Sequence, residues 1–173
     1  MADTHRLFLA LWPDALLRDK ISAYIKQASL TQPSGKPVNK QNLHITLRYI
    51  GAVNKLQLAC IRGVMEKISL TPFELQLDYQ SCWSRPQVAW MGCHKVPKAL
   101  SLLVSDIESA LNECGFAPEL RPYVPHLTFK RKIKHIPTID IPPIAWPIDA
   151  FVLVHSESSP EGVSYRVLNR WPQ

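Results

Sequence analysis

The sequence lacks several features that would place it in a common class of protein. Its four cysteines form no C-x-x-C pair, which argues against a zinc knuckle or a dithiol redox motif. No apolar run approaches the roughly 20 residues that a membrane-spanning helix needs. The first six residues are too polar to start a cleavable signal. From these absences we expect a cytoplasmic protein that has reduced thiols and no membrane association.

The composition is otherwise that of an ordinary globular protein. The 173 residues fit one domain, or two small lobes that share a core. The formal net charge of +6 permits an anionic partner such as RNA or a phosphate ester. Moderate basicity alone does not identify such a partner.

Apolar spacing predicts an alternation of strands and helices. Strands are expected at residues 6–11, 42–50, 73–78, 88–93, 151–155 and 165–168, with helices over about 14–28, 54–68 and 97–114. Asn54 is suited to cap the second helix, and Gly115 to end the third. Loops are expected at 31–40 and 156–162, and Gly51 is expected to end its strand. Prolines 137, 142, 143 and 147 exclude a helix from the region after Arg131.

Two four-residue segments stand out because each places a histidine and a threonine two positions apart in an apolar run. They are His44-Ile-Thr-Leu47 and His126-Leu-Thr-Phe129. In an extended strand, alternate side chains share a face. Thr46 is therefore expected beside His44, and Thr128 beside His126, while the apolar residues face a core.

The shift along the chain that places the first motif on the second relates more than the motifs. It also places Leu7–Leu11 on Ala89–Cys93, and the apolar positions of the first helix on those of the third. Strand, helix, loop and motif strand thus occur twice in the same order. We expect a single domain over residues 1–173 with duplicated units at about 6–51 and 88–131. A pseudo-twofold axis between them would bring the two motifs together across a cleft.

A pair of histidines suits proton transfer near neutral pH, because imidazole titrates near pH 6.5. One neutral and one protonated ring supply a general base and a general acid, as the cleavage of a phosphodiester requires. The threonine hydroxyls can donate to phosphate oxygens. No carboxylate cluster accompanies either motif, which argues against a two-metal site, and a third and fourth ligand for a single metal are not evident. The other four histidines lack the threonine partner and are expected to be surface or core residues.

Charged and aromatic residues near the motifs leave alternatives open. The basic run of Lys130, Arg131, Lys132 and Lys134 is either a solvated strand end or a surface that attracts a phosphate chain. Strict alternation places Lys130 on the His126 face and Arg131 on the opposite face, and it places Arg48 on the His44 face. The aromatic residues that can either stack on a base or pack in the core are Trp83, Trp90, Tyr123 and Tyr165.

The paired H-x-T-x motifs resemble those of the 2H phosphoesterase superfamily. Within it, the chain is similar to the bacterial and archaeal RNA 2′,3′-cyclic phosphodiesterases, also known as 2′-5′ RNA ligases. The similar segments are Arg6-Leu-Phe-Leu-Ala-Leu11, Asn42-Leu-His-Ile-Thr-Leu47, Gly51, Val88-Ala-Trp90 and Tyr165-Arg-Val-Leu-Asn-Arg-Trp171.

This resemblance implies an α+β fold with two βα lobes and antiparallel sheets around a central cleft. It also implies metal-independent hydrolysis of an RNA 2′,3′-cyclic phosphate end to a 2′-phosphate, with no cofactor and no obligate protein partner. His44 would be the proton donor and His126 the proton acceptor, with Thr46, Thr128 and Arg131 binding the phosphate. The role of Arg131 conflicts with strict alternation unless the strand ends or bulges near Lys130.

Two alternatives remain open at the level of sequence. The first is a cyclic phosphodiesterase for small nucleotides, such as ADP-ribose cyclic phosphate or a 2′-5′ oligonucleotide. The second is a protein that binds an RNA end without turning it over. Two intact motifs disfavour the second, because binding alone needs no matched acid and base. The same chemistry in reverse would join a cyclic phosphate end to a 5′-hydroxyl through a 2′-5′ linkage.

Overall fold

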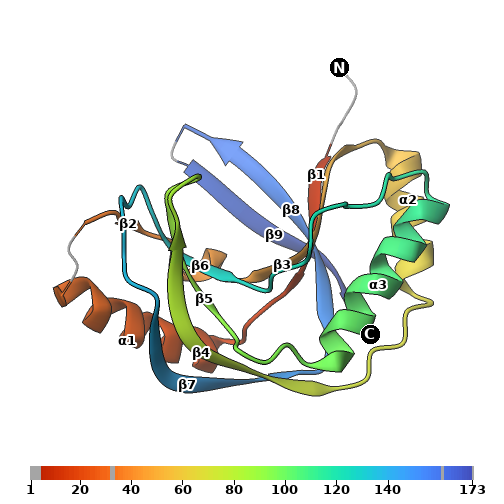
Figure 1. Cartoon of the computed structure of the whole chain (residues 1–173). Coiled ribbons are helices and arrows are strands. Elements are labelled where there is room, and N and C mark those ends of the chain that lie inside the picture. The colour runs from red at the N-terminus through yellow and green to blue at the C-terminus, as the bar shows by residue number, and fades with distance from the viewer. Residues whose placement is uncertain (1–4, 32–33, 161, 173) are drawn as a thin grey trace.

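The computed structural model of the chain describes residues 5–31, 34–160 and 162–172, and its elements alternate as the sequence predicts (Figure 1). The helices are α1 (Ala15–Thr31), α2 (Lys55–Met65) and α3 (Lys98–Glu113), with a 3-10 turn at Lys40–Asn42. The strands are β1 (His5–Leu11), β2 (Lys36–Pro37), β3 (Ile45–Val53), β4 (Phe73–Trp83), β5 (Val88–Gly92), β6 (Leu127–Arg131), β7 (Ile139–Ile148), β8 (Phe151–Ser159) and β9 (Gly162–Trp171).

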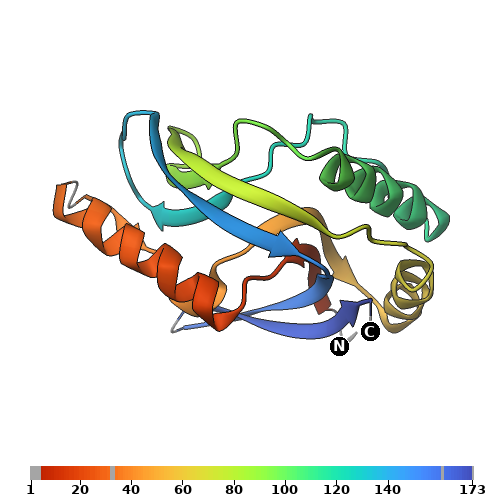
Figure 2. The same ribbon diagram turned by 90° about the horizontal axis from the view of Figure 1, so that it is seen from below.

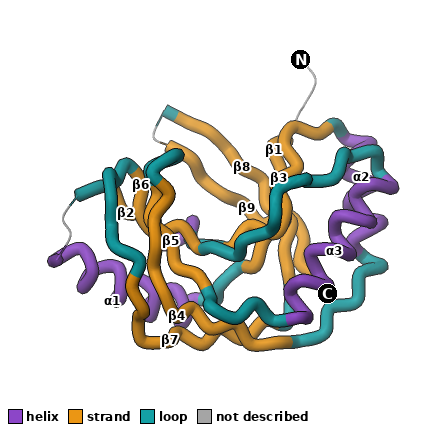
Figure 3. Tube along the Cα trace, in the orientation of Figure 1, coloured by secondary structure: helices purple, strands orange, loops and turns teal. Residues whose placement is uncertain are grey.

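The strands of the described residues all belong to one antiparallel sheet. Its order is β7-β4-β5-β6-β3-β1-β8-β9, and the short β2 pairs with β6. Helix α1 lies at one end of the molecule, whereas α2 and α3 lie side by side at the other (Figures 1 and 2). The strands fill the space between these two groups of helices (Figure 3). The expected α+β class is confirmed, and the two expected sheets are halves of a single sheet that meet where β3 pairs with β6.

Three residues stabilise the helix ends, and two of them, Asn54 and Gly115, are those that the sequence predicts. Asp14 accepts a hydrogen bond from the Leu17 backbone N–H at 2.8 Å and so caps α1. Asn54 forms a reciprocal capping box with Gln57 at the start of α2. Gly115 follows α3 with a φ of +82°, a left-handed conformation that glycine adopts without a Cβ clash.

The core lies between the helices and one face of the sheet. Its members include Leu7, Leu9 and Leu11 of β1, and Leu17, Ile21 and Ile25 of α1, all of them buried. The opposite face of β1 packs in a smaller cluster of Phe8, Ala10, Val152 and Val154, with Trp12 and Tyr165 against it. Strand β1 is therefore buried on both faces, and the second face is the one that carries the motifs.

From the strand order we infer an internal duplication of the kind that the sequence predicts. Counting outward from the β6–β3 junction, one half of the sheet contains β5, β4 and β7, and the other half contains β1, β8 and β9 in the corresponding places. Leu9 pairs with Arg48, and Ala89 pairs with Lys130, so Leu9 of one half corresponds to Ala89 of the other. The shift that relates the two motifs instead places Leu9 on Met91. The sequence alignment of Leu7–Leu11 is therefore displaced by two positions from the structural one.

The expectation of four reduced thiols is wrong for two of them. Cys60 of α2 and Cys114, which follows α3, form a disulfide. The packing of α2 against α3 brings their Cα atoms to 5.9 Å, which is within the normal range for a disulfide. Cys60 and Cys114 are 54 residues apart in the chain and meet only because α2 packs against α3. The spacing of cysteines in the sequence does not predict this pairing. Cys82 and Cys93 are free.

A few boundaries differ from the prediction. Strand β3 continues past Gly51, whose φ of +92° accompanies a register shift against β1. The proline-rich segment 139–148 forms strand β7, which pairs with β4 at the end of the sheet. Residues 1–4, residues 32–33 of the expected loop 31–40, and residue 161 of the expected turn 156–162 lie outside the described residues. Within the described part of the chain, no helix is long and apolar enough to cross a membrane.

Candidate active site

The two histidine motifs meet at the centre of the sheet. Ile45 of β3 pairs with Leu127 of β6 in the antiparallel ladder. When this register is extended by one residue each way, Thr46 lies opposite His126, and His44 lies opposite Thr128. Residues opposite one another project from the same face of a sheet. The structure therefore places both motifs side by side on one face, as the sequence predicts.

Each histidine ring is held by a backbone carbonyl two residues earlier. The Nδ1 of His44 lies 2.7 Å from the carbonyl oxygen of Asn42, and the Nδ1 of His126 lies 2.7 Å from that of Val124. A carbonyl oxygen only accepts, so Nδ1 carries the proton in both rings. In the neutral form, each Nε2 therefore has a free lone pair. In the protonated form, each Nε2 carries the proton that can be transferred.

The threonines flank these reactive nitrogens. The Oγ1 of Thr46 lies 3.1 Å from the Nε2 of His44, so the hydroxyl donates to the neutral ring. Thr128 is half-buried in β6, and its paired residue on β5 is Trp90. Both hydroxyls are thus on the same face as the Nε2 atoms, where a phosphate group could contact both.

Burial disfavours the charged form of both histidines. Desolvation lowers the pKa of His44 to about 4, with further lowering by the positive charges of His126, Arg131 and Arg18. Burial also lowers the pKa of His126. At pH 7 both imidazoles are therefore mostly neutral, and an anion bound between them would counter part of this effect.

Two matched β-bulges reverse the alternation that the sequence predicts beyond the threonines. In β3, Ala10 pairs with Thr46 and Leu9 with Arg48, which leaves Leu47 as an extra residue. Beyond this bulge, Arg48 shares the face of the buried Leu9 and points toward the helices. The expectation that Arg48 lies on the His44 face is wrong for this reason.

The same bulge occurs in β6. Trp90 pairs with Thr128 and Ala89 with Lys130, which leaves Phe129 as the extra residue. Lys130 consequently shares the face of the core residue Ala89 and is 4% exposed. Arg131 turns to the histidine face and is exposed. Strict alternation assigns both of these residues to the wrong face, and the bulge removes the conflict over Arg131.

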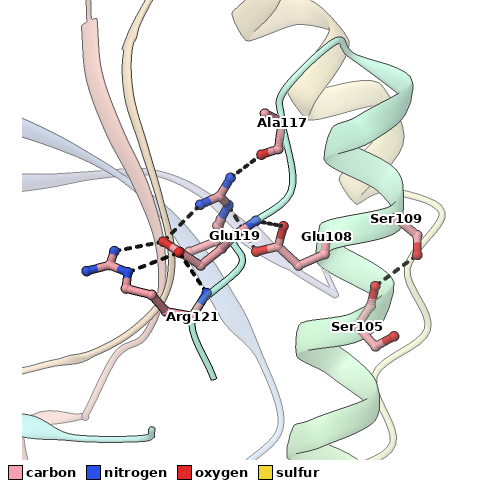
Figure 4. A network of polar contacts seen from close by, with 7 residues as sticks. Ser105, Glu108, Ser109, Ala117, Glu119 and Arg121 are labelled. Atoms are coloured by element: carbon pink, nitrogen blue, oxygen red, sulfur yellow. Dashed lines mark hydrogen bonds and ion pairs between the residues drawn. The ribbon is translucent and has the colours of Figure 1, made fainter. Parts of the chain in front are cut away.

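Arg48 instead forms a polar network with helix α3 and the segment after it. Its side chain contacts Glu108 at 3.0 Å and Glu119 at 3.7 Å, and it donates to the carbonyl oxygen of Ala117 at 2.6 Å. The Arg121 side chain donates two hydrogen bonds to Glu119 and its backbone N–H donates a third, and these contacts lower the pKa of Glu119 to about 2 (Figure 4). This network ties β3 to the segment that leads to His126, and it leaves Arg48 engaged away from the histidines.

Aromatic rings surround each histidine. Trp83 and Trp90 lie 4.6 Å and 6.1 Å from the His126 ring, measured between ring centroids, and Tyr165 lies 5.2 Å from the His44 ring. Tyr123 does not belong with them. It packs against the core, and its hydroxyl donates to the Thr46 carbonyl oxygen at 3.2 Å.

Sequence reasoning missed three residues beside His44. Trp12 stacks on the His44 ring at 5.7 Å, Phe8 lies at 4.9 Å, and the Arg18 guanidinium lies over the Trp12 ring at 4.9 Å. The strand pairing of β1 with β3 creates this group. The one sequence signal within this group is the alternation of Phe8 with the core leucines of β1, which puts Phe8 on the face opposite to them.

No group of three or more metal-binding side chains occurs within the described ranges. Of the remaining histidines, His94 contacts Asp78 and Asp140 at the surface, and His155 contacts Glu157.

Known proteins resemble this chain over nearly its whole length. The family model of the 2′-5′ RNA ligase superfamily matches residues 17–160. The RNA 2′,3′-cyclic phosphodiesterase of Escherichia coli K12 is 29% identical over 99% of this chain and 98% of its own. That of Methanothermobacter thermautotrophicus is 33% identical over 73% of this chain and 70% of its own. The crystal structure of Escherichia coli LigT complexed with 3′-AMP has a TM-score of 0.85 at 29% identity and covers 98% of each chain. These matches confirm the resemblance inferred from the paired motifs.

Proposed function

Because the chain belongs to the 2′-5′ RNA ligase superfamily, we propose that it hydrolyses RNA 2′,3′-cyclic phosphate ends to 2′-phosphates. The observation that carries this proposal is the meeting of the two motifs at the Ile45–Leu127 pair, with both Nδ1 atoms held by carbonyls. This arrangement supplies two imidazole Nε2 atoms on one face, and hydrolysis of a cyclic phosphodiester needs one proton donor and one acceptor.

The proposed reaction assigns each proton to a named atom. His126 Nε2 takes a proton from a water molecule as the water oxygen attacks phosphorus. The bond between phosphorus and the 3′ oxygen breaks, and His44 Nε2 protonates the departing 3′ oxygen. The 2′ oxygen keeps the phosphate. This direction follows the family resemblance, since both rings are held by a backbone carbonyl in the same way and this geometry alone does not distinguish acid from base.

Three side chains complete the proposed phosphate site. The Thr46 and Thr128 hydroxyls donate to non-bridging oxygens, and the Arg131 guanidinium offsets the charge that develops there. The Thr46 hydroxyl donates to His44 Nε2 at 3.1 Å. On binding, it would transfer this hydrogen bond to the phosphate as His44 takes up a proton.

Electrostatics couples protonation to substrate binding in this proposal. A general acid must carry a proton, whereas burial holds the pKa of His44 at about 4 in the free site. The negative charge of the cyclic phosphate raises the pKa of a nearby imidazole. His44 would therefore become an effective acid only when substrate is bound, and it is then that the departing 3′ oxygen needs a proton donor.

The proposal is tested with an oligoribonucleotide that ends in a 2′,3′-cyclic phosphate, incubated in the presence of EDTA. A product with a terminal 2′-phosphate supports the proposal. A 3′-phosphate would reverse the assignment of the leaving group. Loss of activity in EDTA with recovery on adding a divalent ion would replace the two-histidine mechanism with a metal-dependent one. With a 5′-hydroxyl oligonucleotide in excess, that hydroxyl should replace water as the nucleophile, lose its proton to the general base while the 3′ oxygen departs, and give some 2′-5′ ligated product.

A second candidate is a cyclic phosphodiesterase for small nucleotides. The relative that was crystallised with 3′-AMP, a mononucleotide, supports this candidate. Hydrolysis of ADP-ribose cyclic phosphate at a higher kcat/KM than an oligoribonucleotide end would favour it. The aromatic rings beside both histidines suit either substrate, because every base has a face that can stack.

A further inference from the structure

A group of exposed basic side chains gathers at one edge of the site. It consists of Lys36 of β2, Arg85 of the β4–β5 turn, and Arg131, Lys132 and Lys134 at the end of β6 and beyond. We call this group the basic edge. Lys36 pairs with Arg131 across β2 and β6, and Val88 pairs with Arg131 from the other side. The Ile133 backbone N–H donates to the Gln87 carbonyl oxygen at 3.3 Å. These contacts bring three segments that are far apart in sequence into one surface.

Acidic residues are absent from the parts of the chain that supply the basic edge. The segments 20–65, 79–105 and 120–139 contain no Asp or Glu. Basic residues outside the basic edge do form ion pairs with carboxylates of other segments, as Lys40, Arg48, Arg121, Arg166 and Arg170 show. Within the described residues, no ion pair involves a member of the basic edge. Its charges are therefore available to an anion from outside the molecule.

The basic edge adjoins the site on the His126 side. Arg131 lies on the histidine face, and its charge acts on His44. Trp83, whose ring centroid lies 4.6 Å from that of His126, precedes Arg85 by two positions in the chain. A polyanion that leaves the site past Trp83 would therefore meet Arg85, Lys132 and Lys134 next.

We propose that the basic edge binds the phosphates on the 5′ side of a single-stranded RNA whose cyclic phosphate end lies between the two histidines. This inference rests on the proposed function and goes further, because it makes an RNA chain the preferred substrate over a mononucleotide. The reason is chemical: a cyclic phosphate end lies at the 3′ terminus, so every other phosphate of the strand extends from it in one direction. A mononucleoside cyclic phosphate has no group to place on Arg85, Lys132 or Lys134.

The test compares two substrates, an oligoribonucleotide of about ten nucleotides with a 2′,3′-cyclic phosphate end and the matching mononucleoside 2′,3′-cyclic phosphate. The variant replaces Arg85, Lys132 and Lys134 by Gln. The control replaces Lys55, Lys67 and Lys98 by Gln, which removes the same charge from the exposed surface around α2 and α3. Arg131 is kept, because it belongs to the phosphate site.

For the first variant, kcat/KM on the oligonucleotide should fall about tenfold or more at low salt. The slope of its logarithm against the logarithm of salt concentration should become shallower by about 2, since each single-strand phosphate contact contributes about 0.7. Its kcat/KM on the mononucleotide, and both values for the control, should change less than about twofold. Equal losses on both substrates, or no loss on either, would overturn the inference.

A binding measurement separates this inference from the proposed function. A labelled oligoribonucleotide that carries a terminal 2′-phosphate should bind wild-type protein more tightly than it binds the Gln variant, in fluorescence anisotropy. Absence of hydrolysis together with this difference in binding would reject the proposed function and keep the RNA-binding surface. Hydrolysis without a difference in binding would do the reverse.

Discussion

Ile45 pairs with Leu127 where the two halves of the sheet meet. Both side chains are fully buried on the helix side. Their neighbours, two histidines and two threonines, consequently project together from the other face. Each histidine lies opposite the threonine of the other motif, so each histidine–threonine pair across the two strands has one residue from each half of the sheet.

Replacement of either histidine by alanine should lower kcat/KM by about 10²–10⁴, the usual contribution of a general acid or base. The double variant should lose little more than each single variant, because residues that act as a unit are not additive. Steady-state kinetics on the cyclic phosphate oligonucleotide measures both effects. His94→Ala, at a surface histidine that contacts Asp78, is the matched control and should retain activity. Near-normal turnover in His44→Ala or His126→Ala would refute the proposed mechanism.

The pH profile of kcat/KM should be a bell with its maximum below pH 6.5. The active form has one protonated and one neutral imidazole, so activity falls below the lower pKa and above the higher one. In the free site the pKa of His44 is about 4, and the pKa of His126 is also below its ordinary value of 6.5. The maximum of kcat should lie at higher pH, because bound phosphate raises both pKa values. A flat profile of kcat/KM from pH 5 to 9 would contradict two titrating histidines.

Arg131→Ala should weaken catalysis and also raise the pKa of His44. The first effect follows from loss of a charged contact to phosphate, worth about 1.5–3 kcal/mol, or roughly 10–150-fold in kcat/KM. The second follows because the Arg131 charge is one of the causes that lower the pKa of His44. NMR titration of the imidazole resonances measures the shift, and Arg131→Lys should restore the pKa better than the rate. An unchanged His44 pKa in Arg131→Ala would show that the Arg131 charge does not act on the His44 ring.

Arg48→Ala should affect stability rather than catalysis. Its side chain contacts Glu108, Glu119 and the Ala117 carbonyl oxygen. Loss of these contacts should lower the free energy of unfolding by about 1–2 kcal/mol, a range kept low because the ion pairs are only partly buried and water screens part of their attraction. Urea denaturation measures this change. A large loss of kcat at full stability would instead give Arg48 a part in the chemistry.

Reduction of the Cys60–Cys114 disulfide should lower the midpoint of thermal unfolding. The bond closes a long loop and stabilises the folded state by about 2–4 kcal/mol, since it restricts the unfolded chain. Dithiothreitol should shift the midpoint of wild-type protein and leave that of Cys60→Ser unchanged. Four free thiols, rather than two, in the denatured but unreduced protein would show that the disulfide does not form.

The elements that the sequence predicts well are those fixed by local chemistry. Asn54 and Gly115 mark helix ends through their own backbone contacts, and the H-x-T spacing places its side chains by the pleat of a strand alone. The bulges at Leu47 and Phe129 have no such local signal. An extra residue in a strand becomes visible only against the partner strand, and for this reason strict alternation assigns Arg48, Lys130 and Arg131 to the wrong faces.

The residues that sequence reasoning missed are those that long-range pairing brings to the site. Trp12 and Phe8 reach His44 because β1 lies beside β3, and no feature of residues 8–12 specifies that neighbour. The pairing of Cys60 with Cys114 likewise depends on how α2 meets α3. In both cases the contact depends on the tertiary arrangement, and the sequence alone is equally compatible with several other partners.

The disulfide also changes the covalent route between the two halves of the site. Along the backbone, the route from His44 to His126 runs through the whole of β4, β5 and α3. Through the Cys60–Cys114 bond, it needs only the short segments from His44 to Cys60 and from Cys114 to His126. Residues 60–114 form a closed ring that this shorter route bypasses. A single backbone cut anywhere within the ring would leave the two histidines on one covalently connected molecule.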